Sequence, residues 1–139
     1  MGFLVKLDTN GYRPDVLREA IFSGCVDYVA MDIKNCPDMY GVTVGIENFD
    51  VAPILESVNI LKENKVPYEF RTTVLKGLHT EESFSKIGEW LSGVERYFLQ
   101  SFKDSGDLIS TKFVGYDEKE MLTLLNVLNK YIPNAQIRG

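Results

Sequence analysis

Residues 26–34 read VDYVAMDIK, an almost continuous apolar run that gains an aspartate and a lysine toward its end. A strand with one face in water alternates apolar and polar residues, whereas a strand covered on both faces is apolar along most of its length. The run therefore predicts a covered strand. Similar stretches predict strands at residues 3–9, 67–74 and 97–102, and residues 135–138 can add a final one.

Amphipathic segments separate the predicted strands. Residues 14–23 open with a proline and place apolar side chains on one stripe, and residues 50–64 repeat them at helical spacing. Thr80 is expected to cap a third helix, and Asp117 with Glu120 has the capping-box pattern at the start of a fourth. This alternation predicts right-handed βαβ crossovers and a parallel sheet, so the fold class is α/β.

Two stretches have neither pattern. Residues 36–46 are expected to be irregular, and residues 103–116 form a loop that is long for a compact domain. That loop is either part of a surface that docks a partner or a disordered excursion. Because no repeat, low-complexity tract or linker interrupts the chain, residues 1–139 are expected to form a single domain.

Composition excludes several classes of function. With 139 residues, 45% of them hydrophobic, the chain is long enough to bury a core. A net charge of −5 without a Lys/Arg run argues against nucleic acid as a partner. There is no apolar stretch long enough to span a membrane and no secretory signal, so a cytoplasmic protein is expected. Cys25 and Cys36 do not form a CxxC pair, which favours reduced thiols over a zinc site or a disulfide.

Polar residues gather near the carboxyl ends of the predicted strands. Asp8 ends the first, Asp32 and Lys34 end the second, Arg71 lies late in the third and Gln100 in the fourth. In parallel α/β folds, ligands bind where the carboxyl ends of the strands meet. These side chains therefore indicate a binding site, although Gln100 taken alone could satisfy backbone groups instead.

The charged residues of this set also have ordinary interpretations. Asp8 is of a type that often follows a strand as a turn or helix-cap residue. Asp32 and Lys34 can form an exposed ion pair, which contributes at most about 1 kcal/mol. Arg71 can pair with Glu69 on the same strand face. A site is favoured because all these groups occur at equivalent positions.

Four segments occur in a recognisable order: LDTNG at 7–11, DYVAMDIK at 27–34, PYEFRTTV at 67–74 and YFLQSF at 97–102. Together they resemble the radical-SAM activating enzymes of glycyl-radical enzymes, most closely the anaerobic ribonucleoside-triphosphate reductase activating proteins. The resemblance extends from Leu7 to the end of the chain. It implies a parallel partial (β/α)₆ barrel that holds S-adenosylmethionine and a [4Fe–4S] cluster, with this chain as its C-terminal half.

Two motifs of that family do not occur in this sequence. The family's first strand is followed by a CxxxCxxC loop that binds the cluster, and its second strand ends in a GGE-like motif that holds the methionine amine. This chain begins where the third strand would begin, and Cys25 and Cys36 are wrongly placed to replace the missing ligands. We therefore expect the cluster only in the complete enzyme, no catalytic residue in this chain, and no activity from this chain alone.

The resemblance implies a set of cofactor-binding residues: Asp8, Asn10, Asp32, Lys34, Arg71 and Gln100. Asp8 matches the aspartate at the methionine end of the cofactor. The Asp32-x-Lys34 pair matches the residues on the ribose and carboxylate side, and Arg71 matches a basic residue near the reactive end. Gln100 stands where activating enzymes often have a histidine on the adenine side. His79, the only histidine, has no counterpart in this set.

The resemblance also implies a monovalent cation. In pyruvate formate-lyase activating enzymes, the Asp-Thr and Asp-x-Lys positions hold one. In this chain Asp8, Thr9, Asp32 and the carbonyl of Ala30 would supply the oxygen ligands.

The complete enzyme would reduce S-adenosylmethionine to methionine and a 5′-deoxyadenosyl radical. That radical would take hydrogen from a glycine of a partner such as an anaerobic ribonucleotide reductase. Three interpretations stay open: a fragment of an activating enzyme, a split system in which another chain supplies the cluster loop, and a non-enzymatic domain that binds a nucleoside-like ligand or a protein. In this chain by itself, the strand at residues 3–9 is expected to be an unpaired edge that favours self-association.

Overall fold

The computed structural model describes residues 4–102 and 115–138, and within them the chain forms one parallel sheet. Its strands are β1 (Lys6–Thr9), β2 (Tyr28–Asp32), β3 (Tyr68–Val74), β4 (Tyr97–Ser101) and β5 (Gln136–Arg138). Each strand pairs with the next in the chain, in the order β1-β2-β3-β4-β5, and every pairing is parallel. The predicted α/β class is confirmed. Residue 3 of the predicted first strand and residues 103–114 of the predicted loop lie outside the described residues.

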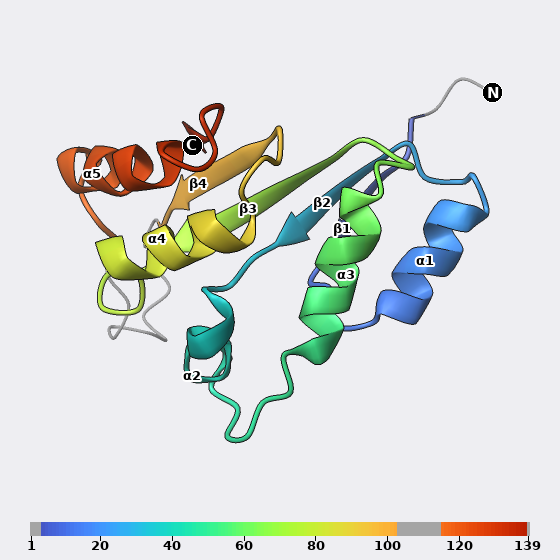
Figure 1. Ribbon diagram of the computed structural model, residues 1–139, viewed down its shortest axis with the longest axis horizontal. Coiled ribbons are helices and arrows are strands. Elements are labelled where there is room, and N and C mark those ends of the chain that lie inside the picture. The colour runs from blue at the N-terminus through green and yellow to red at the C-terminus, as the bar shows by residue number, and fades with distance from the viewer. Residues whose placement is uncertain (1–3, 103–114, 139) are drawn as a thin grey trace.

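The helices cover one face of this sheet (Figure 1). They are α1 (Pro14–Phe22), α2 (Tyr40–Val44), α3 (Ala52–Lys62), α4 (Glu81–Trp90) and α5 (Glu118–Asn129). A right-handed crossover to the next strand in sequence places each connecting helix on the same side of the sheet. Among residues 4–102 and 115–138, the sequential strand order therefore leaves the opposite face free of helices.

The core lies between the sheet and the helices. Alternate residues of the strands, including Val29, Met31, Phe70 and Leu99, are fully buried on this side. Tyr97 is buried with them, and its hydroxyl is hydrogen-bonded to Thr72. Because successive side chains of a strand point to opposite faces, the residues between these buried ones point to the other face.

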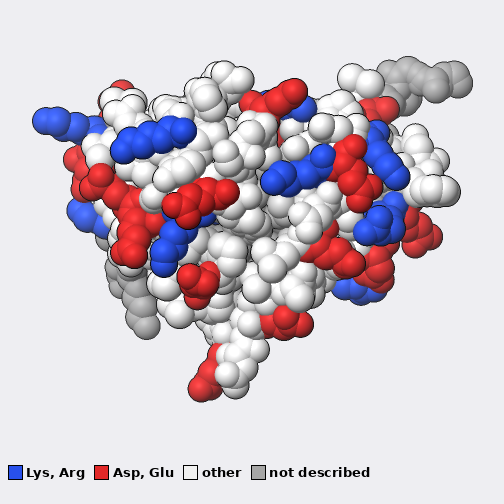
Figure 2. Space-filling view, viewed as in Figure 1, with Lys and Arg blue, Asp and Glu red and all other residues white. Residues whose placement is uncertain are grey.

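The helix ends follow the predicted chemistry. Thr80 caps α4 through the backbone N–H of Ser83, and Asp117 with Glu120 forms the complete capping box of α5. No helix within the described ranges is both long and apolar enough to cross a membrane. Figure 2 shows basic and acidic side chains intermixed over the helix-covered face, without a broad patch of one sign.

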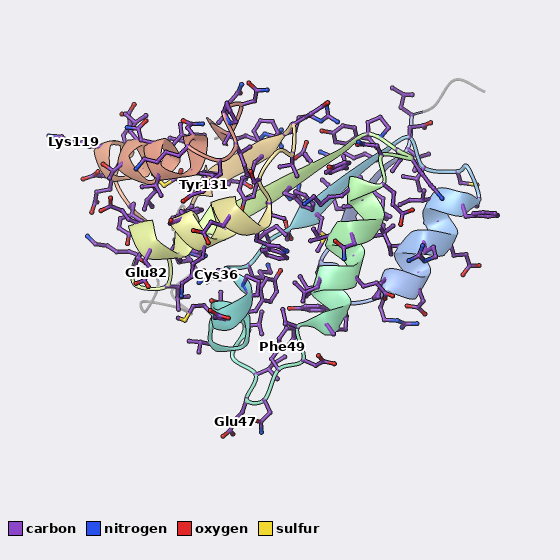
Figure 3. The ribbon with its side chains drawn as sticks, in the orientation of Figure 1. Cys36, Glu47, Phe49, Glu82, Lys119 and Tyr131 are labelled. Carbon is purple, nitrogen blue, oxygen red and sulfur yellow. The ribbon has the colours of Figure 1, made fainter. Side chains whose placement is uncertain are left out.

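The segment predicted to be irregular is partly helical. Pro37–Met39 forms a short 3₁₀ turn and α2 follows it, ending at Gly45 with a φ of +76°. Tyr40 anchors α2 because its ring is buried and stacks on Phe49 with the ring centroids 5.8 Å apart. Figure 3 shows Phe49 near the base of the loop that joins α2 to α3, and Glu47 at the tip of that loop. Five helical residues are too few to produce a periodic pattern, so the sequence did not predict this helix.

The first strand is shorter than expected. It begins at Lys6, and Leu4 and Val5 before it are 90% and 46% exposed. Within the described residues β1 pairs with β2 alone, so it forms an edge of the sheet.

Candidate functional site

The face of the sheet away from the helices, called the inner face below, carries most of the polar side chains of the strands. Asp8, Ala30 and Glu69 lie in one row across β1, β2 and β3. Asp32 and Arg71 lie in the next row toward the carboxyl ends. In chain order, the inner face presents Lys6, Asp8, Tyr28, Ala30, Asp32, Glu69, Arg71, Thr73, Phe98, Gln100 and Arg138.

Four charged side chains from three strands meet near the carboxyl ends. Nε of Arg71 donates to Oδ1 of Asp32 at 2.7 Å, and Nη2 of Arg71 lies 3.7 Å from Oδ1 of Asp8. Nζ of Lys34 lies 3.9 Å from Oδ2 of Asp32. Burial opposes the charge on Arg71, but the hydrogen bond to Asp32 and the charges of both aspartates outweigh it and raise the pKa of Arg71. We call these four residues the Arg71 cluster.

A second charged group lies deeper on the inner face. The side chain of Glu69 is only 3% exposed, and Oε2 accepts from Nη1 of Arg138 at 2.9 Å. The hydroxyl of Tyr28 donates to Oε1 of Glu69 at 2.9 Å, and the Arg138 guanidinium lies 3.7 Å from the centre of the Phe98 ring. Burial opposes ionisation of Glu69, but the bonds from Arg138 and Tyr28 outweigh it, so the pKa of Glu69 lies below its ordinary value. Glu69 thus pairs with Arg138, and Arg71 pairs with the aspartates instead.

Asn10 and Gln100 lie outside the Arg71 cluster. Oδ1 of Asn10 accepts from the backbone N–H of Tyr12 at 3.0 Å, which is a local turn at the exit of β1. Gln100 is exposed and lies opposite Thr73 in the register of β3 and β4. Both are on the side of the sheet where the carboxyl ends meet, and neither contacts Asp8 or Asp32 by a hydrogen bond in the described structure.

The oxygen atoms expected to bind a monovalent cation do not all converge on one point in this structure. Asp8 and Asp32 share the inner face, but the guanidinium of Arg71 lies between their carboxylates. The Thr9 side chain points to the opposite face, and its hydroxyl accepts from the backbone N–H of Gly11 at 3.1 Å. Ala30 is buried in β2. The two carboxylates suit a cation, while the Thr9 hydroxyl does not join them.

A cavity of about 520 Å³ opens beside Asp32 and Lys34. Its size falls within the range of small-molecule sites, and charged and apolar groups line it side by side. The lining residues come from the exits of the strands and from α2: Tyr12, Asp32, Ile33, Lys34, Thr43, Val44, Thr73, Leu75, His79 and Phe102. The cavity can accept a ligand with a polar end and a flat apolar end.

His79 has a structural place that its sequence context did not predict. It is fully buried, Nδ1 accepts from the backbone N–H of Leu75 at 2.9 Å, and Nε2 lies 2.7 Å from the carbonyl oxygen of Lys34. Burial lowers the pKa of His79. A single histidine in a loop has no sequence pattern that would reveal such contacts.

The two cysteines do not form a cluster site. Cys25 is exposed at the amino end of the sheet, before β2, and Cys36 is buried after it. Across residues 4–102 and 115–138, no group of three or more His, Cys, Asp and Glu side chains is arranged to hold a metal ion. The described thiolates therefore do not fit a [4Fe–4S] cluster, which needs several of them together.

Comparison with known proteins supports the family resemblance. A Methanocaldococcus jannaschii protein, provisionally named a glycyl-radical enzyme activating enzyme, is 35% identical over 146 residues. The match covers 99% of this chain and 59% of that protein, so the chain spans less than two thirds of its relative's length. No protein-family model matches the chain.

A solved structure has the same fold. A domain of pyruvate-formate lyase-activating enzyme from Bacteroides vulgatus matches with a TM-score of 0.77 and 19% identity, over 99% of this chain and 83% of that one. The chain is thus homologous to a protein named for glycyl-radical enzyme activation and shares the fold of an activating-enzyme domain. The ribonucleotide reductase subtype and the site residues stay predictions.

Proposed function

We propose that this chain forms the cofactor-facing part of a glycyl-radical-enzyme activating enzyme and binds S-adenosylmethionine at the Arg71 cluster. The observation that carries the proposal is the meeting of Asp8, Asp32, Lys34 and Arg71 beside a cavity at the carboxyl ends of the strands. The homologue with 35% identity supports the same assignment.

The chemistry of the cluster suits the charges of S-adenosylmethionine. Asp8 and Asp32 can accept hydrogen bonds from an ammonium group and from ribose hydroxyls, and Lys34 can neutralise a carboxylate. The cavity beside them has apolar walls for a nucleoside base. We assign Asp8 to the methionine end, Asp32 and Lys34 to the ribose and carboxylate side, and Arg71 to the reactive end.

The outer parts of the ligand would lie farther along the same edge. We assign Gln100 to the adenine side of the ligand. We assign Asn10, which lies at the exit of β1, to the border of the ligand site. A monovalent cation bound between Asp8 and Asp32, with backbone oxygens of Thr9 and Ala30, would require Arg71 to move away from both carboxylates.

The remaining chemistry belongs to the complete protein. When bound, S-adenosylmethionine and a [4Fe–4S] cluster supply the radical that removes hydrogen from a glycine of the partner. We assign the cluster ligands to a segment other than residues 1–139, in the same protein or in another subunit. The proposed partner is a glycyl-radical enzyme of the anaerobic ribonucleotide reductase type. The residues of this chain bind and orient the cofactor and balance its charges.

Replacement of Asp32 tests the proposed site. In the complete protein, Asp32→Ala should weaken S-adenosylmethionine binding by about 1.5–3 kcal/mol, the range for lost hydrogen bonds to a charged group, measured by calorimetry. Glu56→Ala is the control because Glu56 is an exposed carboxylate on α3, the helix-covered side. Equal affinities of Asp32→Ala and the wild type would contradict the assignment. Equal affinity of the wild type for adenosine and for S-adenosylmethionine would favour a nucleoside-binding domain instead.

A further inference from the structure

The chain leaves β2 through a segment whose backbone is held by buried side chains. This segment, Asp32 to Lys34, carries two members of the Arg71 cluster. The backbone N–H of Lys34 donates to the hydroxyl of Tyr40 at 3.0 Å, and that hydroxyl lies 3.4 Å from the carbonyl of Asp32. The Thr72 hydroxyl donates to the carbonyl of Ile33 at 2.7 Å. Tyr40 and Thr72 are 0% and 1% exposed, so these bonds form away from water.

His79 completes this arrangement from a distant part of the sequence. Because Nδ1 accepts from the N–H of Leu75, the proton of the neutral ring is on Nε2, which donates to the carbonyl of Lys34 at 2.7 Å. The ring also lies near Phe84, with the ring centroids 5.9 Å apart. His79 therefore joins the exit of β2 to the segment that follows β3.

Further hydrogen bonds connect the segment that follows β2 with the segment that follows β3. The Asn35 side chain donates to the carbonyl of Leu78 at 2.9 Å and to the Thr43 hydroxyl at 3.0 Å. The hydroxyl of Tyr116 donates to the carbonyl of His79 at 2.6 Å. The exits of β2 and β3, α2 and the segment before α5 are thus linked through buried or half-buried polar groups.

Burying such a network of polar side chains costs free energy compared with burying apolar side chains of the same size. A buried polar side chain stabilises the fold little when satisfied and costs free energy when a partner is lost. A strand end at the protein surface can satisfy its carbonyl groups with water at no such cost. Polar side chains that fix a backbone segment are expected where nearby groups must keep a defined position toward a ligand.

We propose that His79 is a positioning residue for the cofactor site: by holding the Lys34 carbonyl, it sets the direction of the Asp32 and Lys34 side chains. The inference rests on the proposed function, because the ligand is the one assigned to Asp32 and Lys34. His79 itself lines the cavity but its ring nitrogens are both engaged by backbone groups. It acts through the backbone of the segment that it holds.

Three substitutions separate the two bonds of the ring. His79→Gln keeps a donor near the place of Nε2, His79→Asn keeps an acceptor near the place of Nδ1, and His79→Leu keeps neither. Asn129→Ala is the matched control, since the Asn129 side chain likewise donates to backbone carbonyls, those of Ile132, Pro133 and Ala135 after α5. It should lower the melting temperature without changing the cofactor site.

Two measurements on the complete protein test the inference. Amide hydrogen exchange without ligand should speed up at least about tenfold at residues 33–36 in His79→Leu and His79→Asn, and much less in His79→Gln. Calorimetry should show S-adenosylmethionine binding weakened about fivefold or more in the same two variants, with His79→Gln close to the wild type. Asn129→Ala should change neither quantity.

The outcomes distinguish this inference from the proposed function. If Asp32→Ala weakens binding and the folded His79 variants do not, the role of His79 is wrong and the proposed function stands. If His79→Leu does not fold, the comparison between His79→Asn and His79→Gln decides, and equal exchange and affinity in those two overturns the inference. If the wild type binds no S-adenosylmethionine in the presence of its cluster, the proposed function is wrong, and the inference that rests on it is wrong as well.

Discussion

Glu69 is the most deeply buried carboxylate of the inner face, and Arg138 is the cationic side chain hydrogen-bonded to it. Arg138 supplies two bonds to it, at 2.9 and 3.4 Å. Replacing one member of a buried pair leaves the other charge without compensation. The pair is therefore better tested by replacing Arg138, because its side chain is 40% exposed and its removal leaves little cavity.

Arg138→Met should lower the free energy of unfolding by about 1–3 kcal/mol, the cost of leaving a buried polar group unpaired. The measurement is urea unfolding at neutral pH. The double variant Glu69→Gln/Arg138→Met should be more stable than Arg138→Met alone, because a neutral amide can still accept from Tyr28. Equal stability of Arg138→Met and the wild type would show that the pair contributes nothing.

Protonation of His79 should destabilise the fold. Burial lowers the pKa of His79, while in the unfolded chain the imidazole keeps its ordinary pKa of about 6.5. Between the two pKa values the unfolded chain binds more protons, so the free energy of unfolding should fall as the pH falls below about 6.5. The bond from the Leu75 N–H is the one that protonation breaks.

Urea unfolding between pH 7.5 and pH 5 measures this dependence, and His79→Gln is the control because glutamine does not titrate. Glu69 does not contribute in this window, since its pKa is lowered and its stabilisation is lost only below the ordinary carboxylate range. A wild-type curve as flat as that of His79→Gln would contradict the expectation.

For single residues, the sequence predicted which face of the sheet a side chain lies on better than it predicted which partner that side chain contacts. The alternation of side chains along a strand predicted that Asp8, Asp32 and Lys34 face one side. The pairing of Arg71 with Glu69 that the sequence suggested was wrong, because the choice of a partner depends on register and distance. Register across three strands decided it: Arg71 lies opposite Asp32.

Among the elements, α4 and α5 form the closest helix pair, and a glycine permits it. Gly88 is buried in α4, and a methyl group at this position would overlap the ring of Tyr131, which is labelled in Figure 3. Glycine inside a helix costs roughly 1 kcal/mol relative to alanine. The chain keeps it because the ring takes the space that a side chain would need.

Gly88→Ala should therefore destabilise the protein, by about 1–3 kcal/mol from overpacking, although alanine favours the helix. Thermal unfolding of the single variant and of Gly88→Ala/Tyr131→Leu tests the cause. The double variant should be more stable than the sum of the two single changes predicts. A stabilised Gly88→Ala protein would mean that the Tyr131 ring moves aside without cost.

Elements with a period or a cap were predictable, and those without were not. The Thr80 cap, the capping box at Asp117 and the apolar stripes predicted where α4 and α5 begin. The helix α2 has five residues and is held by the burial of Tyr40, which is a tertiary effect. The strand β5 has only three residues, and it lies within the final strand predicted at residues 135–138.

At the scale of the whole molecule, β1 is an edge of the sheet formed by the part of the chain that the structure describes. Leu4 and Val5 precede it and are exposed, and Phe22 at the end of α1 is 87% exposed. An unpaired edge with apolar neighbours is a template for pairing with another chain. The prediction of self-association through this strand is therefore still to be tested.

Sedimentation or light scattering of the 139-residue chain at rising concentration should show association, and Val5→Lys should reduce it. Val42→Lys is the matched control, because Val42 is 65% exposed on α2, away from the edge. A wild-type chain that stays monomeric at high concentration would rule out this edge as an interface. Equal association of both lysine variants would place the interface elsewhere.

The position of Arg138 has a consequence for how the protein is made. A ribosome produces residue 69 well before residue 138, so a nascent chain with β1 to β4 already outside has a Glu69 carboxylate without its guanidinium. Burial would then oppose its ionisation without the opposing effect of Arg138, so the pKa of Glu69 should be higher than in the finished protein. The Glu69 carboxylate should gain its full compensation only when β5 is added. Synthesis therefore sets an order in which this carboxylate is made first and the arginine that balances its charge is added last.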